Sequence, residues 1–183
     1  MTFKPFHDPT HLYFITATVL GWKQLFVQSA YARIVLDSLD WHRSSRRWNL
    51  YAYVLMPNHL HAIIKPLGDR TISSVLQSFG SFTAHAILDA LQREACEDLL
   101  AFFAQRQDRD AGKQHQLWQP IQAKNITSIE FLREKLEYIH NNPVAKRWRL
   151  VGDRADYIYS SGCFYDRGLP PLVPVDDIRE WLE

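Results

Sequence analysis

The sequence predicts an α+β fold of the ferredoxin-like kind, with an antiparallel sheet that has helices on one face and a site on the other. Three observations predict this fold. Apolar, β-branched runs and long helical patterns follow one another in the order β-α-β-β-α-β. The two central runs are separated by a single Pro-Asn pair, as in a hairpin, and one additional C-terminal helix with a tyrosine follows the last strand.

The length and composition fit one domain. The chain has 183 residues, of which 46% are hydrophobic and 13% aromatic, enough to bury a substantial core. We divide it into a main domain, residues 1–167, and a C-terminal tail, residues 168–183, where prolines interrupt any long element. The formal net charge is +1. A nucleic-acid binder with this balance would need a local basic patch.

Cysteine usage and hydropathy indicate where the protein works. Cys96 and Cys163 match no zinc spacing and are too few for a disulfide framework, so we expect two free thiols in a reducing compartment. Lys4, His7 and Asp8 interrupt the N-terminus before a signal-peptide core could form. Because no apolar run reaches the roughly 20 residues of a membrane helix, we expect a cytoplasmic protein without a membrane partner.

The first four elements are read from local patterns. Residues 12–20 (LYFITATVL) are rich in β-branched and aromatic side chains, which favours a strand. Residues 27–47 have apolar side chains at helical spacing and a basic end that suits the helix dipole. Residues 49–56 (NLYAYVLM) are apolar on both faces, as in a central strand. The Pro-Asn pair breaks this pattern, and residues 59–65 resume as the second strand of a hairpin.

The second half of the chain contains a long helix, a loop and a last strand. Residues 71–95 form a long helical pattern, and residues 105–116 (QRQDRDAGKQHQ) are too polar to be anything but an exposed loop. Residues 117–126 predict a strand, which Pro120 places at an edge or a bulge. A short helix over 176–182 is expected in the tail.

The last long helix has a predicted start and end. Thr127 followed three residues later by Glu130 is a capping box. Pro143 ends the helix, because the residue before a proline avoids helical geometry. Its buried stripe consists of Leu132, Leu136 and Ile139.

A pair of histidines lies at the start of the second hairpin strand. His59 and His61 are two residues apart, so on a strand their imidazoles project from the same face and can bind one metal ion together. Leu60 between them points to the opposite face. The alternative is that hydrogen bonds alone satisfy both rings. A zinc site would need further Cys or His ligands, and none is close in sequence.

The last long helix adds a second set of polar groups. Glu134, Tyr138 and Asn142 share one helix face, roughly 100° from the apolar stripe, so Tyr138 should reach the helix edge rather than the core. A phenol is a competent nucleophile toward phosphorus, and an amide oxygen can bind a hard cation. Two imidazoles, an amide oxygen and a phenol together suit a DNA-nicking site. The alternative is a tyrosine that merely packs with its hydroxyl in water.

Two longer segments resemble known signatures. Residues 54–61 (VLMPNHLH) resemble the V-x-M-P-N-H-x-H signature of single-tyrosine HUH transposases, and residues 137–144 (EYIHNNPV) resemble the Y-I-H-N-N-P-V signature of the REP-associated tyrosine transposase branch. Residues 117–119 and 156–161 resemble that branch's L-W-Q and D-Y-x-x-S-S. The order of the motifs is right, and the resemblance runs over residues 12–165.

The resemblance implies a ferredoxin-like catalytic domain over residues 1–167 that nicks and rejoins single-stranded or hairpin DNA. By the same resemblance, His59 and His61 are ligands of Mg²⁺ or Mn²⁺, Asn142 is the third protein ligand and Tyr138 is the nucleophile. The implied reaction leaves a 5′-phosphotyrosine and a free 3′-hydroxyl, and later reverses onto another strand end. Residues 120–124 (PIQAK) depart from the pattern of many relatives, which affects how this strand would dock DNA.

Several alternatives stay open at the level of sequence. The chain could be a domesticated DNA or RNA hairpin-binding protein that does not nick, or a metal-dependent phosphodiesterase that uses water. Three further tyrosines, Tyr157, Tyr159 and Tyr165, are rival nucleophiles without a paired ligand one turn away. Relatives include monomers and dimers that exchange the tyrosine helix, and we favour a homodimer. DNA phosphates would contact two basic clusters, although plain solvation of the charges explains the clusters equally well. These residues are Arg43, Arg46, Arg47, Lys146, Arg147 and Arg149.

Overall fold

The computed structural model describes residues 11–104 and 116–179 of the protein. Within these residues a four-stranded sheet has the order β2-β3-β1-β4, and every neighbouring pair is antiparallel. This confirms the predicted ferredoxin-like α+β fold. The strands are β1 (Leu12–Thr18), β2 (Trp48–Met56), β3 (His59–Pro66) and β4 (Gln122–Ile126).

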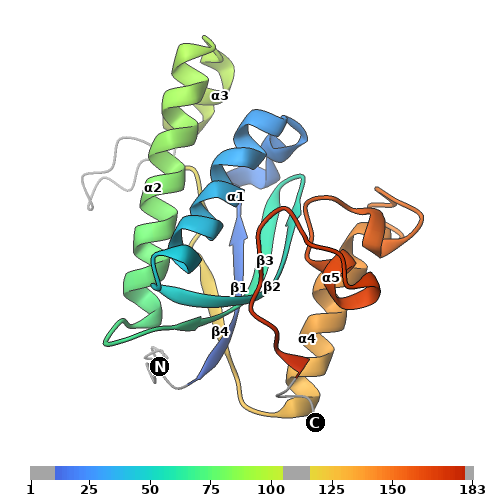
Figure 1. Ribbon diagram of the computed structural model, residues 1–183. Helices are drawn as coiled ribbons and strands as arrows, with labels where there is room; N and C mark the ends of the chain where they lie inside the picture. The colour runs from blue at the N-terminus through green and yellow to red at the C-terminus, as the bar shows by residue number, and fades with distance from the viewer. Residues whose placement is uncertain (1–10, 105–115, 180–183) are drawn as a thin grey trace, which may run out of the picture.

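Helices lie on both faces of the sheet (Figure 1). On one face α1 and α2 pack on a hydrophobic cluster that includes Ile15, Leu60 and Phe79. On the other face α4 packs on a cluster that includes Phe14 and Ile63. The helices are α1 (Ser29–Ser44), α2 (Ile72–Arg93), α3 (Glu97–Ala104), α4 (Ile129–Asn141) and α5 (Gly162–Arg167).

Short 3-10 turns connect these elements. The turns η1 (Leu20–Trp22) and η2 (Leu25–Val27) lead from β1 into α1. The turn η4 (Asn142–Val144) follows α4 directly, and Pro143 within it marks the predicted end of the long helix. The turn η5 (Arg154–Asp156) precedes α5.

Two predicted boundaries are wrong at the strands. The first strand ends at Thr18, because Val19 makes an isolated bridge to Trp118 and the chain turns into η1. The last strand begins at Gln122 rather than at residue 117. Leu117 and Trp118 are buried against α2 instead, where the Trp118 Nε1 donates a hydrogen bond of 2.9 Å to the Thr83 hydroxyl.

The helices also differ from the sequence-based boundaries. Ser128, not Thr127, caps α4, since its Oγ accepts a hydrogen bond of 3.1 Å from the Phe131 amide. The helix α3 is not predicted by the sequence. Of the expected helix over 176–182, the residues up to Ile178 are not helical, Arg179 alone has a 3-10 conformation, and residues 180–182 lie outside the described residues. The predicted loop over 105–116 lies outside them too, apart from Gln116.

The free edge of β2 is covered by the C-terminal segment. The Leu55 amide donates to the Tyr159 carbonyl, and the Ser161 amide donates to the Tyr53 carbonyl. Farther along the strand, Asp176 accepts a hydrogen bond of 2.9 Å from the Leu50 amide. These contacts make the edge of β2 less available for pairing with another strand.

Two remaining sequence-based expectations concern cysteines and membranes. Cys96 and Cys163 are free thiols, as predicted. Over residues 11–104 and 116–179, no helix has the length and hydrophobicity to cross a membrane.

Candidate active site

The two histidines lie at the start of β3, on the sheet face that α4 covers. In the strand register His59 pairs with Met56 and Thr18, while His61 pairs with Val54 and Thr16. Because strand side chains alternate between faces, both imidazoles point to the same side. Their ring centroids are 4.7 Å apart, and both side chains are buried. The β2–β3 hairpin thus holds the pair in place.

Hydrogen bonds fix the orientation of both rings. The His59 Nδ1 donates to the Asn58 side-chain oxygen at 2.7 Å, and the His61 Nδ1 lies 3.0 Å from the Thr16 hydroxyl. Because an amide oxygen only accepts, the His59 Nδ1 carries the proton and the His59 Nε2 keeps its lone pair for a ligand. The Thr16 hydroxyl can accept from the His61 Nδ1 in the same way, and the His61 Nε2 is then free as well. This arrangement gives Asn58 of the Pro-Asn-His segment a role that spacing alone does not reveal.

Both imidazoles are held in the neutral form. Burial, together with the positive charge of Arg147, lowers the pKa of His59 to about 4. Burial, followed by the neighbouring His59, lowers the pKa of His61 to about 3. A neutral imidazole is the form that binds a metal ion, because the protonated ring has no free lone pair.

Tyr138 approaches this pair from α4. Its ring centroid lies 5.1 Å from that of His61 and 6.0 Å from that of Phe14. The side chain is 42% exposed, so it lies at the helix edge and not in the core. The phenol is therefore both next to an imidazole and open to a ligand from solvent.

Asn142 is the C-cap residue of α4, one turn beyond Tyr138, and its side chain is buried. Its Nδ2 donates a hydrogen bond of 3.0 Å to the Tyr138 carbonyl, which leaves Oδ1 as the acceptor that could bind a cation. Among the described residues, no group of three or more His, Cys, Asp or Glu side chains could hold a metal ion. A cation at His59 and His61 would therefore need an uncharged third ligand, and Asn142 fits that need.

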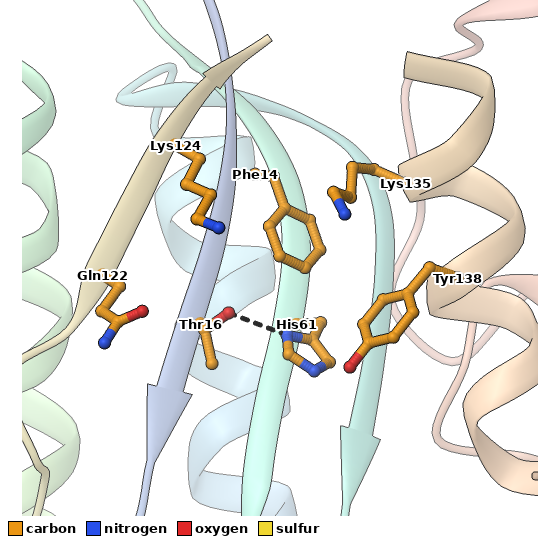
Figure 2. A pocket seen from close by; sticks show the side chains of 7 residues that line it. All are labelled: Phe14, Thr16, His61, Gln122, Lys124, Lys135 and Tyr138. Atoms are coloured by element: carbon orange, nitrogen blue, oxygen red, sulfur yellow. Dashed lines mark hydrogen bonds between the residues drawn. The ribbon is translucent and has the colours of Figure 1, made fainter. Parts of the chain in front are cut away.

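A cavity of about 260 Å³ opens beside Tyr138 (Figure 2). Its chemistry suits an anion, because its lining among the described residues includes two lysines and no carboxylate. The lining residues are Phe14, Thr16, His61, Gln122, Lys124, Lys135 and Tyr138.

Lys135 is the lysine nearest the tyrosine. Its ammonium lies 5.5 Å from the Tyr138 ring centroid and 5.4 Å from that of Phe14. Its side chain is mostly buried, and it forms an ion pair of 2.7 Å with the exposed Glu134. The sequence pattern does not single out Lys135, although its position three residues before Tyr138 places it on the same side of the helix.

Gln122 and Lys124 reach the cavity through strand pairing. Thr16 pairs with His61 on one side and with Gln122 on the other, so these three residues form a row across β3, β1 and β4. Lys124 lies two residues farther along β4, opposite Phe14 of β1. The alternation of strand side chains could have shown that Gln122 and Lys124 share a face.

Comparison with known proteins bears on the fold. Protein-family models give no match to the chain, and neither do the curated proteins. A solved REP-associated tyrosine transposase, bound to a REP hairpin, superposes with a TM-score of 0.65 at 20% identity, over 97% of this chain and 93% of that one. The chain has the fold of a REP-associated tyrosine transposase. At 20% identity this likeness concerns the fold.

A second solved structure adds little. A candidate transposase from Deinococcus radiodurans R1 matches with a TM-score of 0.45 at 15% identity, over 77% of this chain and 95% of that one. This score is too low to support an argument.

The two basic clusters take different places in the transposase fold. Arg43 is half-buried and forms an ion pair of 2.8 Å with Asp176, while the Arg47 guanidinium lies 4.6 Å from the Trp41 ring centroid. Both arginines precede β2, whose first residue lies about 25 Å from the histidine end of the hairpin at the usual rise per residue. The structure therefore does not bring Arg43, Arg46 and Arg47 to the histidine pair.

The second cluster lies beside the site. Lys146, Arg147 and Arg149 follow η4, and the charge of Arg147 acts on both histidines. The neighbouring Trp148 ring lies 5.9 Å from that of His59. This cluster is therefore the better placed of the two for a phosphate backbone.

The rival tyrosines have structural contacts within the transposase fold. The Tyr157 hydroxyl donates to the Leu55 carbonyl at 2.8 Å, and the Tyr165 hydroxyl donates to the Tyr51 carbonyl at 2.7 Å. Burial raises the pKa of both phenols above the usual value. Tyr159 packs its ring against Tyr157. Tyr138 differs from these tyrosines in that its ring lies next to His61 and its side chain is exposed.

Proposed function

We propose that the protein is a tyrosine (HUH) transposase-like enzyme that nicks and rejoins single-stranded or hairpin DNA through a 5′-phosphotyrosine. The observation that carries this proposal is the exposed Tyr138 side chain, whose ring centroid lies 5.1 Å from that of His61, with the second neutral imidazole of His59 next to it. A domain that only binds DNA has no need of this arrangement. The fold likeness to a transposase solved with a REP hairpin supports hairpin DNA as the substrate class.

Tyr138 is the nucleophile in this proposal. Its oxygen forms a bond to the phosphorus of the scissile phosphate as the bond from phosphorus to the 3′-oxygen breaks. The fragment downstream of the nick stays on the tyrosine through its 5′-phosphate, and the upstream fragment leaves with a free 3′-hydroxyl. The phenol loses its proton in this step, and the leaving 3′-oxygen takes one up. Attack by the 3′-hydroxyl of another strand on the phosphotyrosine reverses the step and joins the two strands.

His59, His61 and Asn142 would hold a divalent cation, Mg²⁺ or Mn²⁺. The bound cation would supply positive charge that polarises the scissile phosphate. Asn58 and Thr16 support this role by orienting the two rings through their Nδ1 atoms. Lys135 and Lys124 would balance the remaining negative charge of the phosphate on the cavity side.

The DNA backbone would lie between the two basic sides of the site. Lys124 and Lys135 line the cavity on the sheet side of Tyr138. Arg147 lies near the histidines on the side of η4, with Lys146 and Arg149 next to it in sequence. Such a local patch is consistent with a chain whose formal net charge is only +1.

Trapping of a covalent adduct tests the proposal. Labelled hairpins from the DNA that flanks the gene are incubated with the protein and Mn²⁺ and separated on a denaturing gel. We expect a shifted covalent band that is absent with Tyr138→Phe, while that variant still binds the hairpin. His59→Ala should lose the metal-dependent band as well.

The same gel separates the alternatives. Hairpin binding without any covalent band, with every hairpin of the panel, would favour a non-nicking hairpin-binding protein. Cleavage without an adduct, at an unchanged rate in Tyr138→Phe, would favour hydrolysis by water and exclude Tyr138 as nucleophile.

A further inference from the structure

Trp22 is a large aromatic residue that lies outside the core and close to the candidate site. Its side chain is 58% exposed. The indole ring lies 6.4 Å from the ring of His59, at an interplanar angle of 73°. The exposed indole therefore offers apolar surface to a ligand beside the histidine pair.

The backbone of Trp22 is held in an unusual conformation. Its φ is 57°, in the left-handed region that bulky residues rarely adopt. Gly21 before it has a φ of 63°, and a Cβ at Gly21 would lie 2.5 Å from the Phe102 ring. The Phe102 ring therefore packs closely against this turn. Strain of this kind persists where the surrounding structure fixes it, and it occurs often at ligand sites.

Asn58 ties the turn to the histidine pair. Its Nδ2 donates a hydrogen bond of 3.2 Å to the Trp22 carbonyl, while its Oδ1 accepts the hydrogen bond from the His59 Nδ1. The Trp22 amide in turn donates to the Val19 carbonyl at 2.9 Å. One side chain therefore positions both the candidate metal ligand and the backbone of Trp22, which places Trp22 at the edge of the site.

We propose that Trp22 is a stacking platform for one unpaired nucleobase of the DNA strand, next to the phosphate that Tyr138 attacks. This proposal rests on the proposed function. A nucleobase fits the observations better than a protein partner does, because cationic side chains lie nearby: Lys23 is the next residue, and Arg147 is close to His59. Every base offers a flat face to an indole, so the platform would fix the strand without reading a particular sequence.

Substitution of Trp22 by asparagine separates the effect of the stacking ring from the effect of backbone strain. Trp22→Asn removes the indole but suits a left-handed backbone, so its melting temperature should be no lower than that of the wild type. Trp22→Phe keeps a smaller ring. Trp41→Ala is the matched control, because Trp41 is 48% exposed and lies on α1 against Arg47, in the cluster that is remote from the histidines.

The experiment uses hairpin DNA with 2-aminopurine placed at one unpaired position at a time, in the presence of EDTA so that no cleavage occurs. We expect the wild type to quench the fluorescence at one position or two adjacent positions. Trp22→Asn should lose this quenching and bind the hairpin about ten-fold more weakly. Trp22→Phe should retain part of it, and Trp41→Ala should behave like the wild type.

Binding and quenching by Trp22→Asn at the wild-type level would overturn the proposal, as would equal losses in Trp41→Ala. The adduct gel with Mn²⁺ distinguishes this failure from a failure of the proposed function. If the wild type forms the adduct and Trp22→Asn still quenches normally, the stacking role is wrong and the nicking function stands. If the wild type neither binds the hairpins nor forms an adduct, both proposals fail.

Discussion

Lys135 and Tyr138 illustrate how single residues build the candidate site. The Lys135 ammonium lies against the rings of Tyr138, Phe14 and Phe131, in a cavity that also includes His61. Its ion-pair partner Glu134 is exposed, so water screens this pair and leaves Lys135 able to contact a bound anion as well. On the proposed function, this position would let Lys135 stabilise the phosphate that Tyr138 is proposed to attack.

We expect Lys135→Met to lower the rate of adduct formation by about 100-fold, in line with the loss of one well-placed charge in a transition state. Lys135→Arg should retain part of the rate, because it keeps the charge. Single-turnover assays of the covalent band measure both. Arg133→Met is the matched control on an exposed position of the same helix and should leave the rate unchanged. A Lys135→Met rate equal to the wild-type rate would remove Lys135 from the site.

His42 is a buried titratable residue on the opposite face of the sheet. Its Nδ1 donates to the Ser38 carbonyl at 2.7 Å, and its ring stacks on Trp48. Burial lowers its pKa below the usual value of about 6.5. Between the lowered pKa and about 6.5 the unfolded chain binds more protons, so the free energy of unfolding falls as the pH drops through this window.

We therefore expect the wild type to lose stability between about pH 7 and about pH 5, and His42→Phe to lose less over the same interval, since phenylalanine keeps the stacking and takes up no proton. Urea unfolding at the two pH values measures the difference. Equal losses in the two proteins would show that His42 does not contribute to the acid sensitivity.

At the scale of elements, the start of α4, the helix that carries Tyr138, differs from the sequence-based assignment. Ser128 caps the helix through its Oγ, whereas the sequence pattern favours Thr127. We expect Ser128→Ala to lower the free energy of unfolding by about 1 kcal/mol, and Thr127→Ala to leave it nearly unchanged. Chemical denaturation of both variants measures this. A larger loss in Thr127→Ala would restore the sequence-based assignment.

The pattern of errors in the sequence analysis has a physical explanation. Strands β1, β2 and β3 are predictable because their side chains alternate or are apolar throughout, and the Pro-Asn pair marks the hairpin. The local pattern predicts a strand at Trp118, but its buried indole donates a hydrogen bond to the Thr83 hydroxyl, a tertiary contact that the local pattern does not reveal. Lys124 and Gln122 could not be linked to His61, because the register of β4 on β1 depends on the folded sheet.

At the scale of the whole molecule, the C-terminal segment fastens α4 to its own sheet. The His140 Nε2 lies 2.9 Å from the Ser161 hydroxyl, and the Ser161 amide donates to the Tyr53 carbonyl. On the outer side, Arg154 forms ion pairs of 2.6 Å with Glu137 and 2.7 Å with Asp166, which join α4 to α5. These contacts hold Tyr138 next to His61 of the same chain.

This architecture predicts that the tyrosine acts in cis, even if two chains associate. A mixture of Tyr138→Phe with His61→Ala contains one intact tyrosine and one intact histidine pair on different chains. If α4 stays on its own sheet, the mixture should form no more adduct than either variant alone. The covalent-band assay measures this, with a wild-type and Tyr138→Phe mixture as the control for inhibition. Adduct recovered in the two-variant mixture would require that chains exchange α4, and would make the active unit the homodimer that the resemblance to helix-exchanging relatives favours.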